Sequence, residues 1–208
     1  MPKTNIPVEY VKIIIAHYNE DLSWVDNLQF PFQVISKKTI PEETPPNKGH
    51  EVSAYLEYII KNYENLTDVS VFLHGHRSSW HNVDVDNYLN NEELFDHDYY
   101  NINLIASPRN GESLWTLAEE GVGYLEKNKH VIEKEINQII NPLKIIYRPA
   151  SCFYVKKQSI LKYPLRSYKN WYEWIMTTEQ PSGISSRVFE YCWHIIFTGK
   201  HIDNYLNF

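Results

Sequence analysis

Residues 51–63 carry the clearest structural pattern in this chain. Their apolar side chains recur at helical spacing and form one unbroken stripe: Val52, Tyr55, Leu56, Ile59, Ile60 and Tyr63. Short apolar runs lie before and after this segment, at residues 11–16 and 69–73, and such runs are typical of strands buried on both faces. A strand, a helix and a strand in this order predict a βαβ unit with parallel strands.

The remaining segments extend this pattern. We predict further strands at residues 32–35, 144–147 and 152–155, helices at 167–177 and 186–197, and a mostly helical stretch at 112–140. Residues 78–103 are polar and aromatic without clear periodicity, which favours a functional or interaction loop. Because no repeat or linker divides the chain, the expected fold is a single α/β domain over residues 1–208. Its central sheet is expected to be mostly parallel and flanked by helices.

Composition excludes several classes of protein. The net charge of −6 makes nucleic acid a poor candidate partner. Two cysteines, Cys152 and Cys192, are too few for a disulfide framework and indicate buried thiols in a reducing compartment. No apolar run approaches the roughly 18 residues of a membrane span, and the N-terminus lacks the regions of a signal peptide. We therefore expect a cytoplasmic protein.

Polar side chains follow two of the predicted strands. Residues 17–21 follow the first strand, and the strand at 69–73 is followed by a second cluster: His74, His76, Arg77, Ser78, Trp80 and His81. Ligands of open α/β sheets bind at the carboxyl ends of the strands, so both clusters are expected at one binding site.

The histidines of the second cluster allow two interpretations. His74 and His76 lie two residues apart, so in an extended segment both imidazoles would face one ion, with His194 or an aspartate of residues 84–98 as a further ligand. They would otherwise be loop histidines bonded to carboxylates. The Asp84-Val85-Asp86 string resembles a metal motif, but its place in a polar loop favours a surface role.

Two further motifs also have a functional and an ordinary interpretation. Asn47-Lys48-Gly49 precedes the best helix, where backbone N–H groups and a lysine would suit a diphosphate, although a simple turn explains it as well. Arg187, Glu190 and His194 share one flank of the last predicted helix and would line a cleft or form a solvated face. Walker A, GxGxxG and GxSxG motifs are absent, which disfavours P-loop enzymes, NAD enzymes and ordinary α/β hydrolases.

Three strings carry a family resemblance: AHYNEDLSWV at 16–25, NKGHEVSAYLEYIIKNYENLTDVSVFLHGHRSSWHN at 47–82 and SSRVFEYCWHIIF at 185–197. They resemble a family catalogued as a domain of unknown function, number 3431. That family in turn looks like a compact, Rossmann-like GT-A glycosyltransferase. Leu73-His74-Gly75-His76 stands where such enzymes carry their DxD motif, and residues 152–156 resemble the strand that floors the acceptor site. Replacing two carboxylates by two imidazoles is a departure from that pattern.

The resemblance implies an enzyme that moves a hexose, with glucose the first choice, from a UDP-sugar to an acceptor hydroxyl. It assigns catalysis to Glu190, as general base or as stabiliser of the anomeric cation, and to His76 and Arg187. It assigns donor binding to His17, Tyr18, Asn19, Asn47, Lys48, Gly49, His74, Arg77 and Ser78. It assigns acceptor binding to Trp80, His81, Tyr168, Trp171 and Trp174. A Mn²⁺ or other divalent ion would be held by His74, His76 and His194; otherwise the histidines would contact the diphosphate as cations.

The implied partners are the UDP-sugar and a glycan or glycosylated protein. The nearest resemblance is to giant-virus enzymes that glucosylate galactosyl-hydroxylysine on collagen-like proteins, which would place the protein in host cytoplasm or in a virion. The acidic, aromatic loop at 84–100 would either cover the site or contact a second subunit, and we expect a homodimer. Two other functions stay open: a metal-dependent hydrolase using His74, His76 and His81, and a non-catalytic carbohydrate-binding module using the Trp and Tyr side chains.

Overall fold

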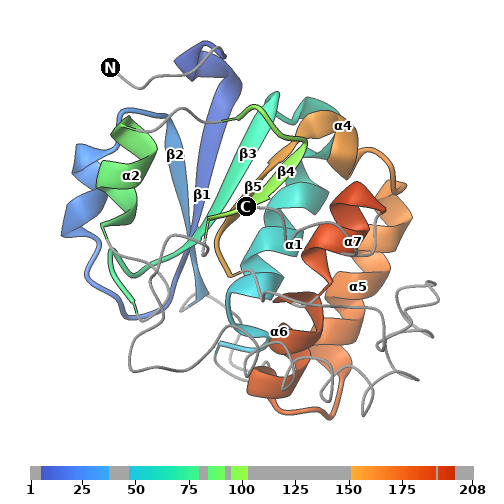
Figure 1. Cartoon of the computed structure of the whole chain (residues 1–208). Coiled ribbons are helices and arrows are strands. Elements are labelled where there is room, and N and C mark those ends of the chain that lie inside the picture. The colour runs from blue at the N-terminus through green and yellow to red at the C-terminus, as the bar shows by residue number, and fades with distance from the viewer. Residues whose placement is uncertain are drawn as a thin grey trace, which may run out of the picture.

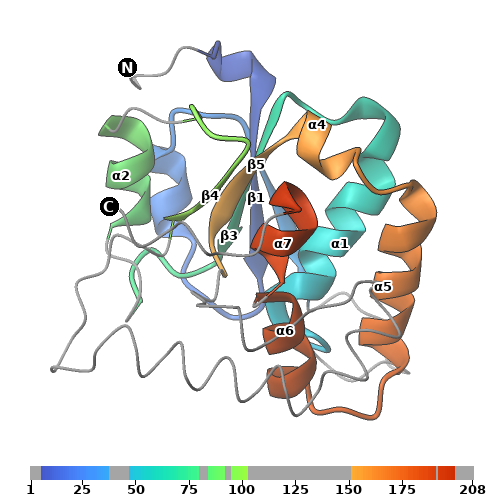
Figure 2. The ribbon, with the colours of Figure 1, turned by 45° about the vertical axis from the view of Figure 1, so that its right-hand side comes forward.

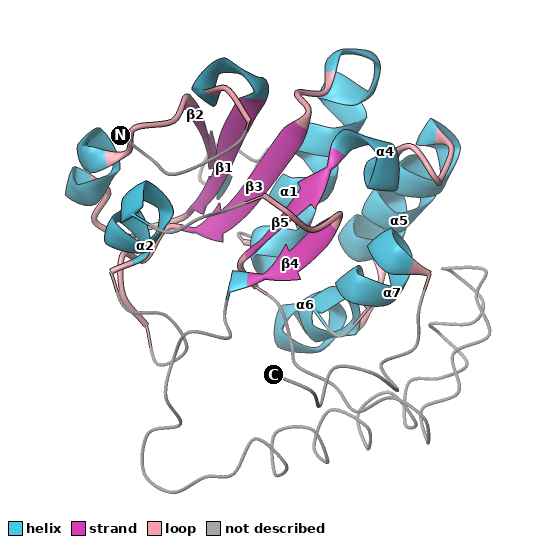
Figure 3. Cartoon of the chain, turned by 45° about the horizontal axis from the view of Figure 1, so that its top comes forward, coloured by secondary structure: helices cyan, strands magenta, loops and turns pink. Residues whose placement is uncertain are grey.

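The computed structural model describes residues 6–37, 47–79, 84–91, 95–102, 151–190 and 192–199. The described residues form a five-stranded sheet in the order β2-β1-β3-β5-β4 (Figures 1 and 3). The strands are β1 (Val11–His17), β2 (Phe32–Ser36), β3 (Val69–His74), β4 (Tyr99–Asn101) and β5 (Phe153–Lys156). The helix predicted at 112–140 and the strand predicted at 144–147 lie outside the described residues.

The sheet is mixed, so the expectation of a mostly parallel sheet was wrong. β1 pairs in parallel with β2 and with β3, as the βαβ pattern predicts. β5 is antiparallel to both of its neighbours, with Phe153 beside Phe72 of β3 and beside Asn101 of β4. An apolar run has the same pattern in either chain direction, so the sequence of β5 could not show which way it runs.

Helices cover both faces of this sheet (Figure 2). One face carries α1 (His50–Asn62), α5 (Leu165–Thr177), α6 (Ser182–Glu190) and α7 (Trp193–Thr198), with the short α4 (Lys157–Ile160) beside β5. The other face carries α2 (Val85–Asn91) and the 3₁₀ turn η2 (Ser23–Asn27). Two further 3₁₀ turns are η1 (Val8–Tyr10) and η4 (Tyr63–Asn65). Within the described ranges no helix is long and apolar enough to span a membrane.

Two predicted boundaries differ from the structure. The single helix predicted at 186–197 is two helices, α6 and α7. Cys192 lies between them at φ −111°, and its N–H donates to the carbonyl of Phe189, three residues earlier, at 2.8 Å. The apolar stripe continues across this break, so periodicity alone does not show it. The region predicted as an irregular loop contains α2 and β4, which are too short for a clear period.

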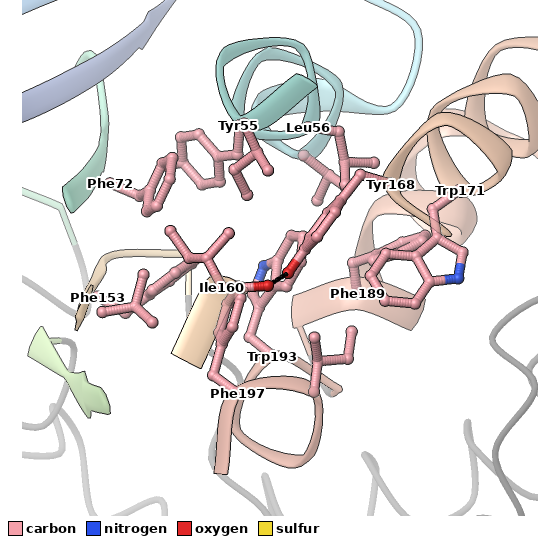
Figure 4. Packing of buried hydrophobic residues seen from close by; sticks show 14 of the residues in the cluster. Tyr55, Leu56, Phe72, Phe153, Ile160, Tyr168, Trp171, Phe189, Trp193 and Phe197 are labelled. Atoms are coloured by element: carbon pink, nitrogen blue, oxygen red, sulfur yellow. Dashed lines mark hydrogen bonds between the residues drawn. The ribbon is translucent and has the colours of Figure 1, made fainter. Parts of the chain in front are cut away.

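Aromatic rings fill the core on the α1 side (Figure 4). Phe153 of β5 lies at its centre, with its ring centroid 5.1 Å from that of Phe72 and 5.5 Å from that of Trp193. Tyr168 of α5 reaches into the same core and donates its hydroxyl to the Ile160 carbonyl at 2.7 Å. The core therefore joins the helical layer to β3 and β5 and holds the carboxyl edge of the sheet in place.

Candidate functional site

The carboxyl ends of β1, β2 and β3 lie along one edge of the sheet, because these strands are parallel. Side chains of a strand alternate between its faces, so His74 continues the row of Phe72 and faces the α1 layer. His17 continues the row of Ile13 and Ile15, which faces α2. The two polar clusters thus meet at one edge, as predicted, but these two histidines point to opposite faces.

The first turn of α1 packs along one stripe of α6. The Gly49 N–H donates to Ser182 Oγ at 3.2 Å, and His50 Nδ1 lies 3.4 Å from Ser186 Oγ. Glu51 follows next, and its carboxyl lies within hydrogen-bonding reach of Glu190. Three consecutive residues, the N-cap Gly49 and the first two residues of α1, therefore meet residues spaced by four on α6, a spacing that forms one face of a helix.

Glu51 and Glu190 form a pair of carboxyl groups in a desolvated position. Burial and then the neighbouring Glu190 charge raise the pKa of Glu51 well above its usual value. Burial also raises the pKa of Glu190, whereas the hydrogen bond from Glu51 and the Arg187 charge act in the opposite direction. The arrangement favours a single proton shared by the pair, retained mainly on Glu51.

Two cationic side chains, Arg187 and Lys37, interact with this carboxyl pair. Arg187 lies one helical turn before Glu190 on α6 and is exposed. Burial lowers the pKa of His50, and the charges of Lys37 and Arg187 lower it further. Lys37 follows β2 directly, and its buried ammonium donates to the Lys48 carbonyl at 3.0 Å and to Ser53 Oγ. A negatively charged ligand at this edge would therefore meet both positive charge and a proton-holding pair.

His74 links the carboxyl pair to the loop after β1. Burial lowers the pKa of His74, although the charges of Glu20 and Glu190 oppose this shift. Glu20 Oε2 accepts the N–H groups of Tyr18 at 2.6 Å and Asn19 at 3.0 Å, and Glu20 Oε1 lies 3.8 Å from His76 Nε2. These contacts match the interpretation of His74 and His76 as loop histidines that face carboxylates, rather than as ligands of one metal ion.

Gly75 allows this close approach between the two loops. A Cβ atom at Gly75 would lie 2.9 Å from Glu20 Oε2, so Glu20 occupies the space that a side chain would need. The Gly75 carbonyl also accepts the indole N–H of Trp24 at 2.9 Å. A residue with a side chain at this position would push Glu20 away from the N–H groups of Tyr18 and Asn19.

Several predicted donor-binding residues are occupied in other contacts. Lys48 donates its ammonium to the carbonyls of Thr178 at 2.6 Å and Gln180 at 3.0 Å, which fixes the turn before α1 to the segment after α5. Arg77 binds the buried carboxylate of Asp86 at 2.9 Å, so Asp86 is not the surface residue that its loop suggested. Ser78 accepts the N–H of Asp84 at 3.0 Å.

The carbonyl of Asn47 accepts the N–H of His50 at 3.1 Å and closes the turn before α1. The contacts of Asn47 and Lys48 therefore fit a simple turn at residues 47–49 better than they fit a diphosphate site.

The predicted acceptor wall is largely part of the core. Tyr168 is 0% exposed and Trp171 1% exposed, so neither side chain offers a surface to an acceptor (Figure 4). Together with Ile175 they form the buried stripe of α5, whereas the acceptor role was implied by the family resemblance alone. Trp174 is partly buried and packs against Phe189, with 6.0 Å between ring centroids. Trp80 and His81 lie outside the described residues.

The predicted metal ligands do not form a cluster. Among the described residues there is no group of three or more His, Cys, Asp or Glu side chains that could hold a metal ion. His194 lies buried on α7 between the core residues Trp193 and Ile195. The break between α6 and α7 also separates His194 from Arg187 and Glu190, so the polar flank predicted on one helix does not exist.

Sequence reasoning missed three residues that contribute to this site, Lys37, His50 and Glu51, whereas Glu20 belongs to the cluster predicted at residues 17–21. Glu51 stands in the first turn of a helix, where an acidic residue is ordinarily explained by the helix dipole. Lys37 follows a short strand in a segment without a motif, and burial of its ammonium is a tertiary effect. The predicted residues Glu190, Arg187 and His74 do lie together with them.

One of the comparisons with known proteins identifies a family. A family model described as "Protein of unknown function (DUF3431)" matches residues 13–205. Neither the curated proteins nor the solved structures contain a match to the chain. Since the match covers nearly all of the 208 residues, the chain belongs to the DUF3431 family of proteins of unknown function.

Proposed function

We propose that this protein is a glycosyltransferase that moves a hexose, with glucose as the first choice, from a UDP-sugar to an acceptor hydroxyl. Its mixed α/β domain would be a compact variant of the GT-A architecture. The observation that carries the proposal is the placement of Glu190 at the carboxyl edge of the parallel strands, next to a second carboxyl and to His74. Ligands of open α/β sheets bind at this edge.

Glu190 is suited to the role of general base. It stands in the last turn of α6, and Arg187 and His74 stabilise its charged form although it is partly buried. A base in such a position takes a proton at the moment of bond formation and contributes about 10²- to 10⁴-fold to the rate. Glu190 is therefore the residue on which we expect turnover to depend most strongly.

Cationic side chains supply the charge that a departing diphosphate needs. Arg187 is exposed on α6 one helical turn before Glu190, and the buried ammonium of Lys37 lies just after β2. Donors fixed before the reaction stabilise developing negative charge without reorganisation. This supports a site in which cationic side chains contact the diphosphate directly, rather than one in which histidines hold a metal ion against it.

In the proposed transfer, Glu190 accepts a proton while UDP leaves the sugar. The acceptor oxygen forms a bond to the anomeric carbon as the bond from that carbon to the diphosphate oxygen breaks. UDP leaves with the electron pair, and the acceptor's hydroxyl proton moves to Glu190. Attack from the opposite side inverts the anomeric configuration, so the configuration of the product also tests this role.

The test combines binding with turnover. We expect UDP and UDP-glucose to raise the midpoint of thermal unfolding, and AMP and GMP to leave it unchanged, because a ligand of the folded state stabilises that state. Glu190→Gln should keep the UDP shift and lose about 10²-fold or more of UDP release with a galactosyl-hydroxylysine peptide. Glu173→Gln, a change at an exposed carboxylate of α5, is the matched control and should keep both.

Other outcomes would contradict the proposal. A midpoint shift with Mn²⁺ or Zn²⁺ alone, without any nucleotide, would favour the metal-dependent hydrolase. A shift with free sugars that survives Glu190→Gln would favour a binding module, although the burial of Tyr168 and Trp171 speaks against it. Turnover is measured with and without Mn²⁺, so that a metal held by substrate and protein together is also detected.

A further inference from the structure

We infer that Glu51 is a positioning residue: it carries a proton and donates it in a hydrogen bond to Glu190, so that the two side chains act as one acid–base pair. The inference rests on the proposed function of Glu190 as the base. It assigns a role to a residue that no sequence motif singled out, and it explains why two acidic groups share one desolvated position.

Packing between α1 and α6 fixes the geometry of the pair. Gly49 contacts Ser182 and His50 lies next to Ser186. These contacts hold the start of α1 against α6 immediately before Glu51. Lys48 adds a further restraint through its bonds to Thr178 and Gln180. Glu51 therefore meets Glu190 across two helices that several independent contacts hold together.

Chemistry requires a proton between the two carboxyl groups. An ionised carboxylate only accepts hydrogen bonds, so two carboxyls within hydrogen-bonding reach are compatible when one of them is protonated. The pKa of Glu51 is raised by burial and by the charge of Glu190, which makes Glu51 the donor. Glu190 is the acceptor, because Arg187, Ser186 and His74 all favour its charged form.

Charged and titratable groups from every neighbouring element face the pair. Arg187 lies on α6 with Glu190, and His74 comes from the end of β3. Cys152 lies before β5, and the tyrosine hydroxyl of Tyr55 lies on α1 one turn after Glu51. Lys37 follows β2, and its ammonium interacts electrostatically with the Glu51 carboxyl. None of these groups is a carboxyl, so Glu51 supplies the protonated carboxyl that faces Glu190.

The role of Glu51 in the reaction is then specific. Glu190 takes the proton of the acceptor hydroxyl, while Glu51 keeps its own proton and its hydrogen bond holds Glu190 ionised and oriented. Without this donor, Glu190 would become protonated at higher pH and would lose the ability to act as a base. A glutamine at position 51 replaces the donor, because its amide N–H₂ group donates without a titrating proton.

The test follows the titration of Glu190 without any substrate. Carboxyl ¹³C NMR of glutamate-labelled protein is recorded against pH for the intact protein, Glu51→Gln and Glu51→Ala, with Glu190→Gln identifying the signal. We expect Glu51→Ala to raise the pKa of Glu190 and Glu51→Gln to leave it near that of the unaltered chain. Glu64→Gln, at an exposed residue after α1, is the control and should leave Glu190 unchanged.

The same variants separate this inference from the proposed function. Where transfer is measurable, the acid limb of the kcat profile should move to higher pH in Glu51→Ala and return in Glu51→Gln. A Glu190 titration that is equal in all three proteins overturns the inference. A shifted titration in a protein that transfers no sugar overturns the proposed function and leaves the carboxyl pair intact.

Discussion

Lys37 illustrates at the residue scale how strongly this edge of the sheet perturbs a side chain. The residue is 4% exposed, and its ammonium binds the Lys48 carbonyl and Ser53 Oγ. Burial lowers the pKa of Lys37 to about 8, although the charges of Glu57 and Glu51 act against this shift. The side chain therefore joins the end of β2 to the first turn of α1 at the expense of a desolvated charge.

A pH dependence of stability follows from this burial. Between about pH 8 and pH 10.5 the unfolded chain holds the Lys37 proton and the folded chain does not, so this contribution raises the free energy of unfolding as pH rises. The gain is at most about 3 kcal/mol. We expect Lys37→Met to remove it, which urea unfolding of both proteins at pH 7 to 10 would measure.

Comparison of the two curves isolates Lys37 from other groups. Buried tyrosines such as Tyr154, whose pKa is raised to about 12, act in the opposite direction at high pH and are present in both proteins. The difference in the free energy of unfolding between the two proteins should therefore change between pH 7 and pH 10. Parallel curves would show that Lys37 titrates in the folded chain as it does in the unfolded one.

At the scale of elements, the approach of α1 to α5 depends on Gly49. The N-terminal boundary of α1 lies at this residue, whose φ of +68° is in the left-handed region that favours glycine. A Cβ atom at Gly49 would lie 2.2 Å from Cγ2 of Ile175 on α5. Gly199, which follows α7, has a φ of +69° but nothing within 4 Å of the same atom.

These two glycines separate backbone strain from helix packing. We expect Gly199→Ala to destabilise the fold by about 1–2 kcal/mol through its positive φ alone. Gly49→Ala should lose about 1–3 kcal/mol more, because Ile175 must move. Urea unfolding of both variants gives the difference, and equal losses would show that α1 and α5 tolerate a wider separation than the contact implies.

Elements were predictable where local pattern decides them. β1, β3 and α1 follow from residues 11–16, 69–73 and 51–63, because an apolar run or stripe needs no distant partner to be recognised. The direction of β5, the break at Cys192 and the burial of Tyr168 depend on tertiary packing. The site divides in the same way: the strand ends predicted His74, whereas Glu51 met Glu190 only through the packing of α1 on α6.

At the scale of the whole molecule, the sheet connects two separate apolar cores. Phe153 belongs to the core on the α1 side, whereas Phe95 belongs to the core on the α2 side and lies 5.1 Å from Tyr154 between ring centroids. Phe153 and Tyr154 are consecutive residues of β5 and face opposite sides. We therefore expect a change in one core to affect the other through β5, the strand that both cores share.

This coupling predicts that the described layers unfold as one unit. We expect Phe153→Ala and Phe95→Ala each to reduce the free energy of unfolding by about 3–5 kcal/mol, as ring removal from a packed core does. With 5-fluorotryptophan labelling, ¹⁹F signals of Trp24 in the α2-side core and Trp193 in the α1-side core report each face separately. Both signals should disappear at one urea concentration in each variant, because two-state unfolding makes all probes coincide. If Phe153→Ala moved the Trp193 transition and left that of Trp24 in place, the two cores would be independent, and the carboxyl edge would be supported from the α1 side alone.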